Sequence, residues 1–196
     1  MNLPNKLTVL RICLIPFVMF FYLASFIPYG IGKIVALVIF VVAALTDMLD
    51  GKIERKHNLV TNLGKFLDPI ADKILTSSVL FMIIADGTIP APWGVIVVSI
   101  IIAREFIVTG LRTVAMSKGV VIAASMTGKI KTCIQIGAVI CVFLFGYNSP
   151  YGENLVFDML GNRYSLGFIA MFIATVFTIY SGVEYLAKNK KLLEDH

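Results

Sequence analysis

Hydrophobic residues along the chain gather into long runs that are separated by short polar breaks. A membrane-crossing helix needs about 20 mostly apolar residues. The pattern predicts six such helices, over residues 10–29, 31–50, 67–86, 92–113, 130–148 and 165–187. Turn-forming residues mark the breaks, with PYG at 28–30, DGTIPAP at 86–92 and NSPYGEN at 148–154. We therefore expect an all-α integral membrane protein, with a single domain over residues 1–196.

Composition agrees with this pattern. The chain is 58% hydrophobic and only 15% charged, with a mean hydropathy of +0.89. A soluble domain is about half apolar and about a quarter charged. The composition therefore excludes an ordinary soluble globule and leaves no long polar segment for a separate soluble domain.

The basic residues predict how the helices cross the membrane. Of the 17 Lys and Arg residues, only Lys33 and Arg163 fall at the connections after the first, third and fifth predicted helices. Because cytoplasmic loops are enriched in Lys and Arg, both termini and the 51–66 loop are predicted to face the cytoplasm. The net charge of +5 lies at membrane edges, which favours anionic lipid headgroups rather than nucleic acid as its partner.

Four aspartates stand between the second and third hydrophobic runs, at positions 47, 50, 68 and 72. Residues three or four apart share one face of a helix. We therefore expect Asp47 and Asp50 on the end of the second helix to converge with Asp68 and Asp72 on the start of the third. Clustered carboxylates repel one another unless cations neutralise them, and all-oxygen ligands favour hard ions such as Mg²⁺ or Mn²⁺. Four carboxylates suffice for two ions with bridging ligands, an arrangement that clamps phosphoryl oxygens.

Neighbouring residues fit a site that handles phosphate. Gly51 lets a ligand approach the helix closely, and Arg55 offers two parallel hydrogen bonds to a phosphate. Gly64 opens the return to the third helix.

The spacing Asp-x2-Asp-Gly-x3-Arg-x8-Gly-x3-Asp-x3-Asp, over residues 47–72, resembles the signature of the CDP-alcohol phosphatidyltransferase family. Every spacing matches, although Glu54 stands where the family pattern has alanine before the arginine. The resemblance implies a homodimeric enzyme of the cell membrane that uses a CDP-diacylglycerol donor, two divalent metals and an alcohol acceptor, and releases CMP. It implies that Asp47, Asp50, Asp68 and Asp72 hold the metals, that Asp72 is also the general base, and that Gly51, Arg55 and Gly64 lie along the donor.

Two further stretches resemble the phosphatidylglycerophosphate synthase branch of this family, whose acceptor is sn-glycerol 3-phosphate. The first is NLPNKLTVLR at the N-terminus, interpreted as a short interfacial helix with Asn5, Thr8 and Arg11 on one face beside the nucleotide. A plain amphipathic helix explains Asn5 and Arg11 equally well.

The second stretch is REFIVTGLR at 104–112, followed by GKIKT at 128–132. An acceptor with its own phosphate needs cations, and we expect Arg112 and Lys129 to bind it, with weaker roles for Lys131 and Arg104. Because charges inside a membrane are costly, mutual pairing, or pairing with another helix, is an equal alternative for Arg104 and Glu105.

Other interpretations remain open. Within the family, the acceptor is alternatively inositol phosphate, serine or phosphatidylglycerol. A membrane prenyltransferase is disfavoured because the chain has one compact aspartate block and only six predicted helices. A divalent-cation transporter is disfavoured because the four aspartates lie at one membrane edge. The roles of Glu54, Glu105 and Glu184 stay unassigned.

Overall fold

The computed structural model describes residues 3–24, 26–57, 62–87, 89, 91–120, 122, 125–146, 156–159 and 162–190. Within the helices and strands, the side chains of residues 3–4, 29, 47–57, 62–66, 68, 156–159 and 162–164 lie outside what it describes. The elements are the helices α1 (Leu3–Leu23), α2 (Tyr29–His57), α3 (Asn62–Ala85), α4 (Trp93–Ser117), α5 (Met126–Phe145) and α6 (Leu166–Lys188), and the strands β1 (Val156–Met159) and β2 (Asn162–Ser165).

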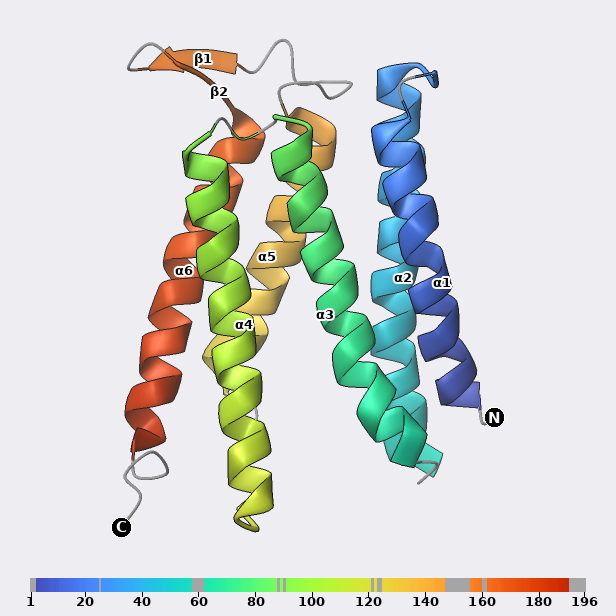
Figure 1. Cartoon of the computed structure of the whole chain (residues 1–196), viewed down its shortest axis with the longest axis vertical. Helices are drawn as coiled ribbons and strands as arrows, with labels where there is room; N and C mark the ends of the chain where they lie inside the picture. The colour runs from blue at the N-terminus through green and yellow to red at the C-terminus, as the bar shows by residue number, and fades with distance from the viewer. Residues whose placement is uncertain are drawn as a thin grey trace.

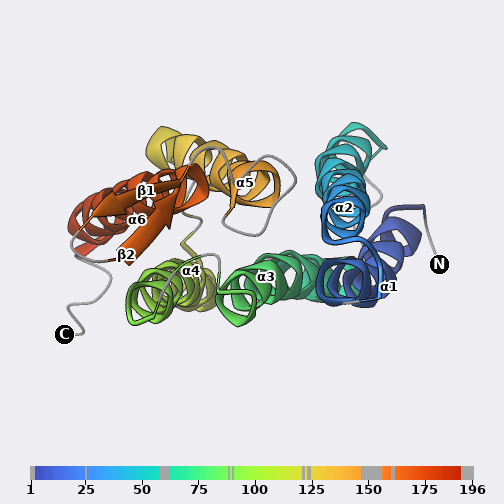
Figure 2. The ribbon, with the colours of Figure 1, turned by 90° about the horizontal axis from the view of Figure 1, so that it is seen from above.

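The helices run alternately up and down the long axis of the molecule (Figure 1). The start of α1 and the end of α6 therefore lie at the same end, together with the end of α2 and the start of α3. Helix α1 packs against α2 and α3, while α6 packs against α4 and α5, as the view from above shows (Figure 2). The bundle thus consists of two groups, α1–α3 and α4–α6. They meet where α3 contacts α4 and where α2 contacts α5.

Several of these helices are suited to cross a membrane. Within the described residues, four are long and apolar enough, namely α1 from Asn5, α4, α5 and α6. Helix α2 adds a shorter apolar stretch, Gly30–Thr46. The chain is therefore a multi-pass membrane protein.

Several polar residues are buried inside the bundle, and many large apolar residues are exposed on its outer surface. On α1 the buried positions Asn5, Thr8, Arg11, Ile15 and Val18 follow one another at spacings of three or four, and so form one face. On the outer surface, by contrast, the side chain of Phe17 is 56% exposed. This distribution suits a lipid surround, because hydrocarbon solvates phenylalanine and leaves charged groups to the interior.

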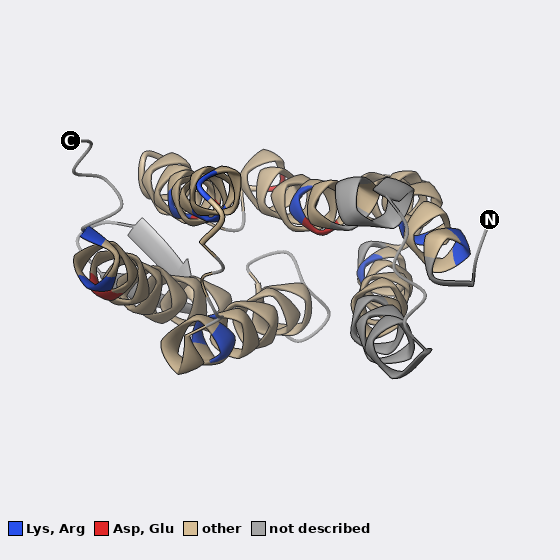
Figure 3. Cartoon of the chain, turned by 90° about the horizontal axis from the view of Figure 1, so that it is seen from below, with Lys and Arg blue, Asp and Glu red and all other residues tan. Residues whose placement is uncertain are grey.

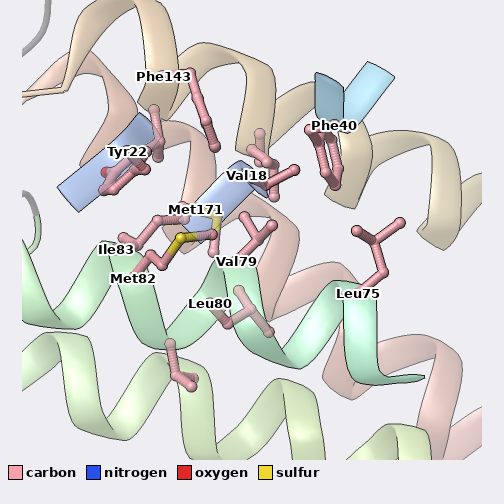
Figure 4. Close-up of a cluster of buried hydrophobic side chains, with 14 of the residues drawn as sticks. Val18, Tyr22, Phe40, Leu75, Val79, Leu80, Met82, Ile83, Phe143 and Met171 are labelled. Carbon is pink, nitrogen blue, oxygen red and sulfur yellow. The ribbon is translucent and has the colours of Figure 1, made fainter. Parts of the chain in front are cut away.

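An apolar core fills the middle of the bundle (Figure 4). The ring of Phe143 on α5 meets Tyr22 of α1 edge-on, with centroids 4.9 Å apart, and stacks on Phe40 of α2 at 6.1 Å. Leu75 and Val79 of α3 are buried in the same cluster. Helices from both halves of the chain therefore share one core.

A buried ionic network joins α1, α2 and the end of α3. Lys33 Nζ lies 2.7 Å from Asp86 Oδ2, and neither side chain is exposed. The hydroxyl of Tyr22 donates to the same oxygen at 3.0 Å, and the Lys33 ammonium lies 4.9 Å from the Tyr22 ring centroid. An isolated charge would be costly here, so each partner makes the other tolerable.

Three expectations from the sequence need correction. First, α1 is one continuous helix from Leu3 to Leu23, so a separate short interfacial helix at the N-terminus is wrong. Second, β1 and β2 form a small antiparallel hairpin, pairing Val156 with Ser165, which the sequence did not predict beside the helices. Third, the helix bounds differ by several residues; α1 begins at Leu3 and α5 at Met126, ahead of the predicted 10 and 130. Ser125 accounts for the start of α5, since its hydroxyl accepts from the Gly128 N–H at 3.0 Å.

Candidate active site

The aspartate motif lies on two helix ends, as the sequence predicted. The backbone of α2 carries Asp47, Asp50, Gly51 and Arg55, and continues to His57. Helix α3 begins at Asn62, before the other part of the motif, which is Gly64, Asp68 and Asp72. Both helix ends lie at the same end of the molecule (Figure 1).

Most of the motif lies outside what the structure describes beyond its backbone. This holds for the side chains of Asp47, Asp50, Arg55 and Asp68 and for the surroundings of Gly51 and Gly64. Convergence of the four carboxylates therefore stays a prediction, as do the donor contacts of Gly51, Arg55 and Gly64. The side chain of Asp72 is described, and it is exposed.

Asp72 lines a polar cavity at this end of the bundle, which we call the basic cavity. Its volume is about 210 Å³. Helices α3, α4, α5 and α6 contribute its walls. The lining residues are Asp72, Lys73, Arg104, Glu105, Val108, Thr109, Arg112, Ser125, Gly128, Lys129, Thr132 and Tyr185. The structure thus brings Arg104, Arg112 and Lys129 together with Asp72, and basic positions gather at this end of several helices (Figure 3).

Two arginines of the basic cavity are held in place by α6. Arg104 donates from Nη2 to the hydroxyl of Ser181 at 2.7 Å, beside Gly182, where an added Cβ would lie 3.0 Å from Arg104 Cγ. Arg112 donates from Nε to the Tyr185 hydroxyl at 3.2 Å, with its guanidinium carbon 5.6 Å from the ring centroid. Lys129 lines the cavity from an exposed position near the start of α5.

Glu105 forms the electrostatic centre of this region. Its carboxylate lies 2.5 Å from Lys73 Nζ of α3, accepts a hydrogen bond from Lys131 of α5, and lies 3.5 Å from Arg104 Nη1. The Glu105 and Lys131 side chains are 17% and 4% exposed. Lys131 is therefore the buried partner of Glu105, and the pairing anticipated as an alternative for Arg104 and Glu105 is present. One carboxylate links three helices.

A second, smaller cavity opens on the other side of Asp72, and we call it the inner cavity. Its volume is about 90 Å³ and its surface is mostly apolar. The lining residues are Arg11, Phe40, Ala44, Asp72, Leu75, Thr76, Val79, Glu105, Lys131, Thr132, Gln135, Ile136 and Val139. Asp72, Glu105 and Thr132 line both cavities, so they form the shared wall.

Only one of the three predicted N-terminal residues lines the inner cavity. Arg11 lines the inner cavity and is fully buried, whereas Asn5 and Thr8 are buried on the same face of α1 but are not among its lining residues. The common face of the three residues is confirmed, since they recur every three positions along one helix.

Sequence reasoning assigned no role to several polar residues that line these cavities: Lys73, Thr76, Thr109, Ser125, Thr132, Gln135 and Tyr185. Gln135 lies four residues after Lys131 and was within reach of a helical-face argument, whereas Lys73, directly after Asp72, does not share its face. Tyr185 gave no such signal, because its contact with Arg112 depends on how α6 packs on α4.

Asp72 supplies one carboxylate of the kind that a hard divalent cation prefers. Asp72 presents an exposed carboxylate to both cavities, and the other acidic residue in their described lining, Glu105, already has two lysine partners. Among the described side chains there is no cluster of three His, Cys, Asp or Glu residues. A metal at Asp72 would therefore take its further ligands from the motif aspartates whose side chains lie outside the description.

The sequence of the chain matches a known protein family over most of its length. The model of the CDP-alcohol phosphatidyltransferase family matches residues 1–180. The chain belongs to the CDP-alcohol phosphatidyltransferase family. As a member of this family it is a transferase, and the resemblance seen in the 47–72 motif is confirmed.

Named relatives match nearly the whole chain. A protein of Bacillus subtilis (strain 168) is 43% identical over 204 residues, which is 98% of this chain and 97% of the relative. Proteins of Rickettsia bellii (strain RML369-C) and Yersinia enterocolitica (serotype O:8) are 36% and 34% identical, over 97% and 99% of this chain and 96% and 98% of their own lengths. All three carry the name CDP-diacylglycerol–glycerol-3-phosphate 3-phosphatidyltransferase.

The role of Glu105 in this phosphatidyltransferase can be tested by Glu105→Gln. The change leaves Lys73 and Lys131 without their countercharge inside the bundle, and breaking a buried ion pair costs about 3–5 kcal/mol. We expect a clearly lower midpoint of thermal unfolding in detergent micelles, measured by loss of the monodisperse peak after heating.

Glu184→Gln is the matched control, because its partner Lys188 is 65% exposed and the pair lies within one helix. Its unfolding midpoint is expected to fall much less. Equal midpoints for Glu105→Gln and the wild type would contradict the central role of Glu105.

Proposed function

We propose that the protein transfers the phosphatidyl group from CDP-diacylglycerol to sn-glycerol 3-phosphate, giving phosphatidylglycerophosphate and CMP. The observation that carries this proposal is the position of Asp72 in the wall between an apolar cavity and a basic one. A lipid-linked donor suits the first cavity, and a small anionic acceptor suits the second. The names of the relatives support the same reaction.

The acceptor phosphate binds in the basic cavity in this proposal. Arg112 and Lys129 are its direct ligands, since both line the cavity and neither is part of the Glu105 cluster. Arg104 lines the same cavity, while Ser181 fixes its guanidinium. Lys131 acts less directly, because its ammonium is buried against Glu105. Serine as an acceptor has no phosphate and would leave these cations without a purpose.

The donor lies on the side of α1 and α2. Arg11 lines the inner cavity and binds the donor phosphates in this proposal. Asn5 and Thr8 on its face, and Gly51, Arg55 and Gly64 in the motif, complete the donor site in this proposal. Apolar walls of α3 and α5 then border the lipid portion of the donor.

Asp72 removes the proton from the acceptor hydroxyl. The hydroxyl oxygen then forms a bond to the phosphorus that carries diacylglycerol, and the bond from this phosphorus to the CMP oxygen breaks. A general base must lie within hydrogen-bond reach of the hydroxyl whose proton it removes. The exposed position of Asp72 at both cavities supports this role.

Asp47, Asp50, Asp68 and Asp72 would hold two divalent cations, Mg²⁺ or Mn²⁺. Bound there, the ions withdraw charge from the donor pyrophosphate and make CMP a better leaving group. The protein residues supply the positions of donor, acceptor and base.

In the membrane, we propose that α2 and α3 also cross, so that a single catalytic domain over residues 1–196 has six spans. Both termini and the aspartate motif face the cytoplasm of the cell membrane. The common end of α1, α6 and the motif supports this orientation (Figure 1), as does the distribution of Lys and Arg. The active form is a homodimer, as the family resemblance suggests.

A divalent-cation transporter is the alternative outside enzymes. A cation path needs acidic groups that are free to change partners. The carboxylate of Glu105 on α4 lies beside both cavities, and it is paired with two lysines, Lys73 and Lys131. This pairing favours the transferase.

The reaction is tested with purified protein, CDP-diacylglycerol, Mg²⁺ or Mn²⁺, and glycerol 3-phosphate, by measuring CMP release. Asp72→Asn is expected to lower kcat by about 10²–10⁴-fold, the usual contribution of a general base, with donor binding largely preserved. Asp158→Asn, on β1 at the opposite end, serves as the control and is expected to keep wild-type activity.

No CMP from the wild type with glycerol 3-phosphate, inositol phosphate, serine or phosphatidylglycerol would refute the transferase. A loss of donor affinity in Asp72→Asn that matches the loss of rate would contradict only the base assignment. Faster CMP release with inositol phosphate or phosphatidylglycerol than with glycerol 3-phosphate would correct the acceptor.

Arg112→Ala tests the acceptor site. A hydrogen bond to a charged group contributes about 1.5–3 kcal/mol, so the KM for glycerol 3-phosphate is expected to rise about 10- to 100-fold, with the donor KM little changed. Lys118→Ala, on the same helix end but outside the lining of the basic cavity, controls for loss of positive charge. An unchanged acceptor KM in Arg112→Ala would remove Arg112 from the site.

A further inference from the structure

Gln135 of α5 is a buried amide whose polar atoms lack hydrogen-bond partners among the described residues. Its side chain is 4% exposed, and neither Nε2 nor Oε1 is hydrogen-bonded. Most buried polar groups in proteins are paired, because an unsatisfied one costs free energy. An unpaired amide that lines a cavity therefore points to a ligand that pairs with it.

The surroundings of Gln135 define the chemistry of that ligand. Its neighbours in the inner cavity include the apolar side chains of Leu75, Val79, Ile136 and Val139. Gln135 lies four residues beyond Lys131, which is about 6 Å farther along the helix axis from the start of α5. These apolar neighbours suit a neutral hydrogen-bonding group on an apolar body, whereas Arg11 of the same cavity suits the donor phosphates.

An ester-linked lipid has such a group at that depth. If the donor pyrophosphate lies near Asp72, the glycerol backbone follows, and the ester carbonyls come next, at the border of the acyl chains. A carbonyl oxygen accepts a hydrogen bond from an amide N–H. An ether linkage has no carbonyl, and its oxygen is a weaker and differently placed acceptor.

We propose that Gln135 Nε2 donates a hydrogen bond to an ester carbonyl of the diacylglycerol donor, so that the inner cavity distinguishes ester-linked from ether-linked lipid. Gln135 is then a specificity-determining residue for the donor and takes no part in proton transfer. This inference rests on the proposed function, because it assumes that the inner cavity receives the lipid portion of the donor.

The test compares CDP-diacylglycerol with the CDP-dialkylglycerol of equal chain length, at saturating glycerol 3-phosphate. The wild type is expected to prefer the ester donor by about tenfold in kcat/KM, the size expected when one buried polar group is left without its hydrogen bond. Gln135→Leu is expected to bring this ratio close to one, through a higher KM for the ester donor and an unchanged kcat/KM for the ether donor.

Two further measurements separate ligand binding from a structural role. The thermal midpoints of Gln135→Leu and Gln135→Met are expected to equal or exceed that of the wild type, because an apolar residue of similar size removes an unsatisfied amide. Cys133→Ala, on an exposed face of α5, is expected to keep the ester preference.

The outcomes are distinct. No CMP from either donor with the wild type would refute the proposed function itself. An active wild type without ester preference, a preference that persists in Gln135→Leu, or lower thermal midpoints in both Gln135 variants would overturn the assignment of Gln135 and leave the transfer reaction standing.

Discussion

The arrangement of helices around the two cavities depends on the ion pairs of Glu105 with Lys73 and Lys131. Charges inside an apolar bundle are tolerated only when they are paired. Glu105 of α4 binds Lys73 of α3 and Lys131 of α5, so one acidic group fixes three helices relative to one another. Because Lys73 adjoins Asp72, the same contacts determine where the Asp72 carboxylate stands.

This arrangement divides the interior into two chemical environments. On one side of Asp72, Arg104, Arg112 and Lys129 make a cavity suited to a small anion. On the other, residues of α2, α3 and α5 form apolar walls with Arg11 and Gln135 as polar groups. At the opposite end of the helices, Lys33, Asp86 and Tyr22 hold α1, α2 and α3 together. The basic cavity and the buried ionic network therefore lie at opposite ends of the bundle.

Local patterns in the sequence predicted much of this. The spacing of the aspartate motif placed Asp47 and Asp50 on one helix and Asp68 and Asp72 on the next, and α2 and α3 agree. The three-residue repeat of Asn5, Thr8 and Arg11 predicted their common face, because a helix has a fixed period.

Contacts between distant segments were not predictable in the same way. The choice of Lys131 rather than another cation as partner of Glu105, and the contact of Tyr185 with Arg112, depend on the packing of separate helices. The β1–β2 hairpin was missed because two four-residue strands beside a long apolar helix give little periodic signal.

In the proposed function, the two cavities that share Asp72 bind donor and acceptor together, and the phosphatidyl group passes directly between them. The most direct measurement is isotope exchange between labelled CMP and CDP-diacylglycerol in the absence of glycerol 3-phosphate. Direct transfer predicts no exchange until the phosphatidylated product is added, with intersecting lines in the two-substrate initial-rate plot. Rapid exchange without acceptor or product, together with parallel lines, would reveal a phosphatidyl-enzyme intermediate and contradict this account.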